Sequence, residues 1–220
     1  MIDHLISKSK FKEAYENLFG KLIHNRISPN QITLLGLFFG LCGALMISLS
    51  QFIQNQYILL VISLILVIIS FFFDTIDGVV ARFKDPTWFG GILDIFCDRT
   101  VEISIIIGII SNDPELLWPG IFSLASIVLC ITAFLSIGAV DKKFNSKGLE
   151  KVIFYSKGIM ERSETVIFLI AMIILPFMRL ILLWIFAILV FLTSLQRIRF
   201  AYFRFNQKRN GQENNIDFSN

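Results

Sequence analysis

Four aspartates lie at the junction of two apolar segments, each long enough to form a helix. Asp74 and Asp77 stand three apart at the end of the first segment, and Asp94 and Asp98 stand four apart at the start of the second. Residues at these separations share one face of a helix. Because the connecting loop, residues 83–89, is short, we expect the two helices to be antiparallel neighbours with all four carboxylates at one end.

Carboxylates without histidine or cysteine partners suit a hard divalent cation such as Mg²⁺ or Mn²⁺. Four like charges in a partly desolvated pocket repel one another, so we expect a counter-ion, and the cluster could hold one or two ions. In transferase sites such ions usually bind phosphate oxygens. The aspartates therefore predict metal-dependent chemistry on a phosphate group.

Small residues and one arginine accompany the aspartates. Gly78 carries no side chain, so a phosphate could approach its backbone, and Ala81 is also small. Arg82, one helical turn after Gly78, could bind phosphate through two hydrogen bonds. Gly90 would let the two helices approach closely. Together these residues predict a pocket for a diphosphate, a divalent ion and a substrate tail embedded in the membrane.

The elements that hold this cluster are predicted to be membrane helices. The chain of 220 residues is 55% hydrophobic, with a mean hydropathy of +0.71, whereas soluble domains are about 45–50% apolar. Apolar runs of about 20 residues are long enough to cross a bilayer as helices. Six such runs occur, at residues 31–52, 57–80, 90–110, 119–140, 164–181 and 183–203. The predicted fold class is therefore all-α and integral to the membrane, with six transmembrane helices.

The chain divides into three parts. Residues 1–28 repeat apolar side chains at helical spacing with lysines between them, which predicts an amphipathic helix at the membrane interface. Residues 29–205 form the predicted six-helix domain. Ser28 is the predicted N-cap of its first helix, and Pro29 lies in the first turn of that helix. Residues 206–220 are polar and without periodicity, and we expect them to form a disordered tail.

Positive charges alternate with the apolar segments along the chain. Lysines and arginines gather before the first segment, between the second and third, in the 141–163 loop and at the C-terminal end. By the positive-inside rule, both termini and the aspartate cluster are predicted to be cytoplasmic. Because the cations follow the membrane pattern, nucleic acid is not an expected partner.

The residues around the aspartates resemble the signature of the CDP-alcohol phosphotransferase family. That signature is Asp, two residues, Asp-Gly, two residues, Ala-Arg, a spacer, Gly, three residues, Asp, three residues, Asp. Its fixed positions are filled by Asp74, Asp77, Gly78, Ala81, Arg82, Gly90, Asp94 and Asp98. The spacer before Gly90 is one residue shorter than is common in the family, which blurs the alignment of residues 83–87.

The resemblance extends to the six spans, the leading interfacial helix and the Pro29–Thr33 stretch. It implies that the four aspartates bind Mg²⁺ or Mn²⁺ and that Asp98 is the general base, which takes the proton from the attacking hydroxyl. The spacing alone permits this role but does not single out Asp98. The positions that hold the CDP-lipid in this family correspond to Pro29, Asn30, Thr33, Gly78, Ala81, Arg82, Thr87 and Gly90.

The reaction implied by the resemblance is attack by an alcohol on the β-phosphate of CDP-diacylglycerol. It transfers a phosphatidyl group and releases CMP, so the expected role is phospholipid biosynthesis in the membrane. Such a transfer depends on positioning and on cations that stabilise charge on phosphate oxygens. The family also implies a homodimer, which nothing in the residues themselves indicates.

Two further stretches concern the acceptor. Leu93–Arg99 and Gly158–Glu164 resemble the phosphatidylinositol phosphate synthase branch of the family, except that Thr165 stands where the branch has an arginine. This implies a small phosphorylated polyol, either inositol phosphate or glycerol 3-phosphate. The basic residues on the correct side of the membrane to bind it are Arg162, Arg197, Arg199, Lys142 and Lys143. The alternative for these cations, favoured for the two lysines, is contact with anionic lipid head groups.

Two other classes of protein share parts of this pattern. An intramembrane prenyltransferase also uses aspartates and Mg²⁺ with a diphosphate donor, but it would carry two separate aspartate-rich motifs. A divalent-cation transporter would place its carboxylates near the middle of the spans, whereas these lie at the ends. Release of CMP from a CDP-lipid would exclude transport as the main function.

Overall fold

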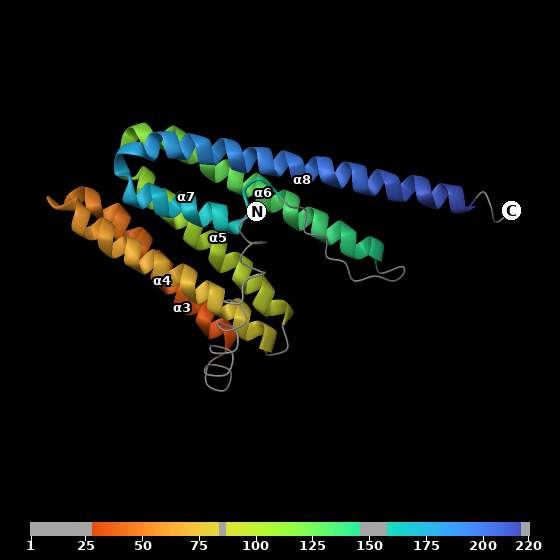
Figure 1. Ribbon diagram of the computed structural model, residues 1–220, viewed down its shortest axis with the longest axis horizontal. Helices are drawn as coiled ribbons and strands as arrows, with labels where there is room; N and C mark the ends of the chain where they lie inside the picture. The colour runs from red at the N-terminus through yellow and green to blue at the C-terminus, as the bar shows by residue number, and fades with distance from the viewer. Residues whose placement is uncertain (1–27, 84–86, 146–157, 217–220) are drawn as a thin grey trace, which may run out of the picture.

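The computed structural model describes residues 28–83, 87–145 and 158–216. Within these ranges the chain is all-helical and contains no strand, which confirms the predicted all-α class. The amphipathic helix predicted for residues 1–28 lies outside the described residues, except for Ser28. Figure 1 shows α3, α4 and α5 in one group, α6 and α8 in another, and α7 between them.

Helix α3 (Pro29–Leu49) begins where the sequence predicts. The Ser28 hydroxyl accepts a hydrogen bond from the Gln31 backbone N–H at 3.3 Å, and the Gln31 side-chain oxygen accepts one from the Ser28 N–H at 2.9 Å. This reciprocal capping box satisfies two backbone donors, and proline at the first helical position removes a donor that would have no partner. The helix ends in a 3₁₀ turn, η1 (Ser50–Phe52).

Helices α4 (Gln56–Phe83) and α5 (Trp88–Ile110) are joined by the short loop that separates the two pairs of aspartates. They make few contacts with each other, because α3 packs extensively against both. The expectation of direct antiparallel neighbours is therefore wrong for most of their length. The two helices converge at the aspartate end, where their carboxylates meet.

Small residues of α3 allow this close packing. A methyl group on Gly40 would lie 2.5 Å from Val101 Cγ2 of α5 and 2.8 Å from Ser70 Oγ of α4. The Ser70 hydroxyl donates a hydrogen bond to the Gly36 carbonyl at 2.7 Å. Glycine lets the backbones of membrane helices approach one another, so α3 forms the centre of this three-helix group.

Helix α6 (Leu117–Asn145) follows a 3₁₀ turn, η2 (Pro114–Leu116), and packs mainly against α8 (Arg179–Ile216). The hydroxyl of Ser123 on α6 donates a hydrogen bond to the Leu183 carbonyl of α8 at 3.1 Å. In Figure 1, α8 runs beside α6 and extends beyond it toward the C-terminus. These two helices therefore form the second group of the bundle.

Helix α7 (Arg162–Ile174) contacts α4, α5 and α8. Its 13 residues span about 20 Å, short of a hydrocarbon core of about 30 Å. The predicted fifth span, 164–181, is therefore wrong at its end. Pro176 lacks a backbone N–H and opens a 3₁₀ turn, η3 (Pro176–Met178), after which α8 begins at Arg179 rather than at residue 183.

Helix α8 continues to Ile216. The helix therefore includes residues 206–216 of the segment that the sequence predicts to be a tail. No proline interrupts this polar segment, and extending an existing helix avoids the unfavourable nucleation step.

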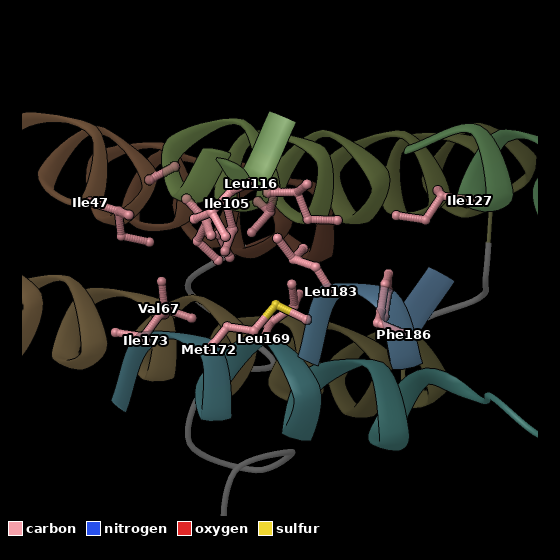
Figure 2. Packing of buried hydrophobic residues seen from close by; sticks show 14 of the residues in the cluster. Ile47, Val67, Ile105, Leu116, Ile127, Leu169, Met172, Ile173, Leu183 and Phe186 are labelled. Carbon is pink, nitrogen blue, oxygen red and sulfur yellow. The ribbon is translucent and has the colours of Figure 1, made fainter. Parts of the chain in front are cut away.

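The hydrophobic core gathers where α7 meets its neighbours. Leu169 and Met172 of α7 belong to one buried cluster with Val67 of α4, Ile105 of α5 and Phe186 of α8 (Figure 2). All five side chains are fully buried. This packing fixes the short α7, whose first residue is the arginine predicted to bind the acceptor.

Several helices are long and apolar enough to cross a membrane. In the described part of the chain four segments qualify, namely Pro29–Phe52, Gln56–Ala81, Pro114–Val140 and Pro176–Asn206. Helix α5 has sufficient length, but four charged residues between Asp94 and Glu102 lower its hydropathy. The protein is therefore integral to the membrane.

Candidate active site

The predicted aspartates lie where the end of α4 meets the starts of α3, α5 and α7. The residues that line this pocket are Thr33, Gly36, Leu37, Ser70, Phe71, Asp74, Asp77, Cys97, Asp98, Val101, Glu102 and Arg162. The pocket thus combines segments that are far apart in the sequence. Its polar residues are mostly acidic, with one arginine facing them.

Asp74, Asp94 and Asp98 form the acidic centre of the site. Each contributes a carboxylate oxygen to a group whose members all lie within 4.8 Å of one another. Asp94 Oδ1 is buried and has no hydrogen-bond partner in the described part of the chain. Oxygens that converge in this way, with a buried lone pair unused, fit a hard divalent cation.

Asp77 stands apart from these three carboxylates. It is only 5% exposed, and its Oδ2 accepts a hydrogen bond from the Thr33 hydroxyl of α3 at 2.6 Å. The structure therefore groups three of the four predicted metal ligands and ties the fourth to α3. Thr33, predicted to contact the CDP-lipid, contacts an aspartate here.

Arg162, the first residue of α7, reaches the acidic centre. Its Nη2 forms ion pairs with the Oδ1 atoms of Asp74 and of Asp98, the latter at 2.6 Å. A capping box holds the start of α7, with the Glu164 carboxylate accepting a hydrogen bond from the Glu161 N–H at 3.2 Å. The structure thus brings the predicted acceptor-binding arginine onto the predicted metal-binding carboxylates.

The starts of α3 and α5 lie against each other. Thr87 is the N-cap of α5 and accepts a hydrogen bond from the Gly90 N–H at 3.0 Å. A methyl group on Gly90 would lie 3.0 Å from Thr87 Oγ1 and 3.2 Å from Asn30 Oδ1. Three of the residues predicted to contact the CDP-lipid are therefore neighbours, and Pro29 precedes Asn30 directly.

Gly78 faces open space. A methyl group added there would meet no other atom within 4 Å, so packing does not account for this glycine. Ala81 is half-buried, two residues before the end of α4. Arg82 belongs to the same helix, but its side chain lies outside the described atoms.

The remaining predicted acceptor residues are not brought to the aspartates. Arg197 Nη1 donates a hydrogen bond to the Cys130 carbonyl at 3.1 Å, and its guanidinium lies over the Phe134 ring. The guanidinium of the exposed Arg199 lies over the Phe203 ring. Lys142 and Lys143 belong to α6, and their side chains lie outside the described atoms.

Glu102 and Arg99 are two charged residues of the site region that the signature does not contain. Glu102 lines the pocket and is 2% exposed, and its carboxylate accepts a hydrogen bond from Arg99 Nη1 at 2.5 Å. A spacing of four residues from Asp98 to Glu102 was the available sequence signal, because it places both on one helix face.

Long apolar helices around clustered carboxylates define a membrane protein with a candidate divalent-cation site. The chain belongs to the CDP-alcohol phosphatidyltransferase family, whose model matches residues 26–210. This match confirms the resemblance carried by the aspartate signature.

Two archaeal relatives share sequence with part of the chain. The archaetidylinositol phosphate synthase of Pyrococcus horikoshii is 32% identical over 103 residues, which cover 46% of this chain and 50% of the relative. The archaetidylinositol phosphate synthase of Methanothermobacter thermautotrophicus is 36% identical over 101 residues, 46% of each chain. The chain thus spans about half the length of these curated relatives.

Two solved structures of phosphatidylinositol phosphate synthase from Mycobacterium tuberculosis share the fold. The structure with CDP-DAG bound has a TM-score of 0.56 and 23% sequence identity. The match covers 85% of this chain and 92% of the mycobacterial chain. The structure with manganese and citrate has the same TM-score and identity. That match covers 84% of this chain and 88% of the mycobacterial chain.

Proposed function

We propose that the protein transfers a phosphatidyl group from CDP-diacylglycerol to a hydroxyl of a small phosphorylated polyol, inositol phosphate or glycerol 3-phosphate, and releases CMP. The observation that carries this proposal is the contact of Arg162 with Asp74 and Asp98. It places a phosphate-binding side chain beside the carboxylates that define the family. The relatives with inositol phosphate synthase names and the related fold with bound CDP-DAG support the same reaction.

Asp74, Asp94 and Asp98, with Asp77 beside them, would hold one or two Mg²⁺ or Mn²⁺ ions. Their grouped oxygens and the unused lone pair of Asp94 support this assignment, as does the manganese in the related structure. Bound divalent ions neutralise phosphate oxygens and stabilise the charge that develops during phosphoryl transfer. The hydrogen bond from Thr33 orients Asp77 for this role.

Asp98 would act as the general base. The acceptor hydroxyl gives its proton to the Asp98 carboxylate as its oxygen forms a bond to the β-phosphorus. The bond from that phosphorus to the bridging oxygen breaks, and CMP leaves with the electron pair. The ion pair with Arg162 fixes the orientation of the Asp98 carboxylate, and a general base typically contributes about 10²–10⁴-fold to the rate.

The CDP-lipid would lie along α4 and the starts of α3 and α5. The open space at Gly78 leaves room for a phosphate against the backbone. Arg82, one turn further along α4, would pair with that phosphate. The neighbouring Asn30, Thr87 and Gly90 would form the nucleotide side of the same pocket. Pro29 and Ala81 would line it with small side chains.

The acceptor would enter from the side of α7. Arg162 is the best-supported contact for its phosphate, since it already lies at Asp98. Arg197 and Arg199 would be additional contacts for this phosphate. Arg197 is bonded to a carbonyl of α6, and Arg199 lies over the Phe203 ring. Lys142 and Lys143 would attract the anion to this side of the membrane.

Six membrane crossings are part of the proposal: the four long apolar segments, α5, and α7 together with the η3 turn that follows it. The aspartates and both termini would then face the cytoplasm, as the charge pattern predicts. The protein would work as a homodimer, with an interfacial helix before residue 29.

A panel assay tests the function. Purified protein with Mg²⁺ or Mn²⁺ and CDP-diacylglycerol is given one acceptor at a time: glycerol 3-phosphate, inositol phosphate, inositol or serine. We expect CMP release with a phosphorylated polyol and none with inositol or serine. Turnover with serine alone, or no CMP release with any acceptor, would contradict the proposal.

A further inference from the structure

A second pair of charges in α5 is formed by Arg99 and by Glu102, which lies one helical turn after Asp98. Asp94, Asp98 and Glu102 follow at intervals of four residues and so share one face of the helix. Glu102 is 2% exposed. A buried carboxylate in a membrane helix is costly unless it is paired, and it usually marks a functional position.

Glu102 is paired with an arginine that is much more accessible. The side chain of Glu102 is 3% exposed and that of Arg99 is 30% exposed, and the two are joined at 2.5 Å. In the described part of the chain Glu102 is the only residue that accepts a hydrogen bond from the Arg99 guanidinium. An arginine carries five N–H donors in a fixed fork, so one edge is held and the other donors remain available to a ligand.

Arg99 is also close to the reacting groups. It follows Asp98 directly in the sequence, and Arg162 contacts Asp98 from α7. Arg99 lies within electrostatic range of the Asp94 and Asp98 carboxylates, and it is joined to Glu102, which lines the pocket. Two arginines therefore flank the carboxylate that would receive the acceptor proton, one from each of two helices.

We propose that Arg99 binds the phosphate of the acceptor and that Glu102 is the positioning residue that holds its guanidinium. The proposal rests on the proposed function, because it requires a phosphorylated acceptor whose hydroxyl reaches Asp98. A phosphate monoester carries enough oxygens to accept hydrogen bonds from Arg99 and Arg162 together. Glu102 removes the entropic cost of ordering the arginine at each turnover.

The test compares Glu102→Gln, Arg99→Lys and the double variant with the wild-type protein in CMP release. The acceptor is inositol phosphate or glycerol 3-phosphate, whichever the wild type uses. Each single variant is expected to raise the acceptor KM about tenfold, since a hydrogen bond to a charged group contributes that much. The KM for CDP-diacylglycerol and the Mn²⁺ affinity, measured by electron paramagnetic resonance, are expected to stay unchanged.

The double variant separates positioning from a purely structural role. If Glu102 acts through Arg99, the double variant is no worse than Arg99→Lys alone, and Glu102→Asp recovers part of the acceptor affinity. Glu115→Gln, an exposed glutamate at η2, is the matched control and leaves every constant unchanged. If Glu102→Gln is not folded, Arg99→Lys carries the test, because its side chain is accessible.

Two results would overturn the inference. One is an unchanged acceptor KM in Arg99→Lys. The other is an equal rise in both KM values in Glu102→Gln, which would make the pair structural. A wild-type protein that transfers only to unphosphorylated acceptors would refute the proposed function as well, so the two failures are distinguishable.

Discussion

Asp98 is the residue on which the proposed chemistry depends most. Asp98→Asn keeps the size of the side chain and removes its ability to take a proton. We expect transfer to fall by at least about a hundredfold, with the protein still folded and still able to bind CDP-diacylglycerol. Single-turnover CMP release and a binding assay with the same preparation check this, and near-wild-type turnover would refute the assignment of the base.

Arg162 is expected to affect both acceptor binding and metal binding, and Arg162→Ala should change the two in opposite directions. Without its guanidinium, the acceptor loses a phosphate contact, so Arg162→Ala is expected to raise the acceptor KM at least about tenfold while the KM for CDP-diacylglycerol changes little. Because Arg162 also lies on Asp74 and Asp98, Mn²⁺ should bind the variant more tightly. Glu115→Gln, an exposed residue of η2, is the control. A rise only in the CDP-lipid KM would place Arg162 on the nucleotide side.

At the residue scale, the sequence predicted which side chains form the site better than how they pair. Local periodicity placed Asp94 and Asp98 on one face of α5, and the structure groups both with Asp74. The Thr33–Asp77 hydrogen bond joins residues 44 apart, and the Arg162–Asp98 contact joins residues 64 apart. Such pairings depend on how helices pack, which the spacing within one helix does not specify.

At the scale of elements, α3 determines how α4 and α5 are placed. Gly40→Ala would put a methyl group against Val101 and Ser70, and overpacking of this kind costs about 1–3 kcal/mol. We expect the melting temperature in detergent to fall by about 5 °C, with a loss of Mn²⁺ affinity as the carboxylates separate. Gly138→Ala, where a methyl group meets no atom within 4 Å, is the matched control. A stable Gly40→Ala with normal Mn²⁺ binding would show that the helices can repack.

The bounds of the helices were predictable where a cap or a charge marks them, and less so elsewhere. Ser28 and Pro29 gave the start of α3 correctly. The end of α7 was missed because the apolar run continues past Pro176, and hydropathy alone does not register the break. Arg179 completes this break, since its Nε donates a hydrogen bond to the Met172 carbonyl at 3.0 Å. The side chain thereby satisfies a carbonyl in the last turn of α7.

At the scale of the whole molecule, the connections alternate between two ends of the bundle. The capped start of α3, the aspartates and the start of α7 lie at one end. The turns η1, η2 and η3 connect the helices at their other ends. Because the basic segments belong to the first end, we expect the site to face the cytoplasm.

Cysteine labelling tests this orientation. In a background that lacks Cys42, Cys97 and Cys130, the exposed Asn55→Cys should react with a membrane-impermeant maleimide added to intact cells. The exposed Asn206→Cys, on the site-side half of α8, should react only after the cells are permeabilised. The opposite pattern would place the carboxylates outside, where cytoplasmic CDP-lipid headgroups do not reach them, and would contradict the proposed reaction together with the orientation. Equal labelling of both positions in intact cells would mean that α8 does not cross the membrane.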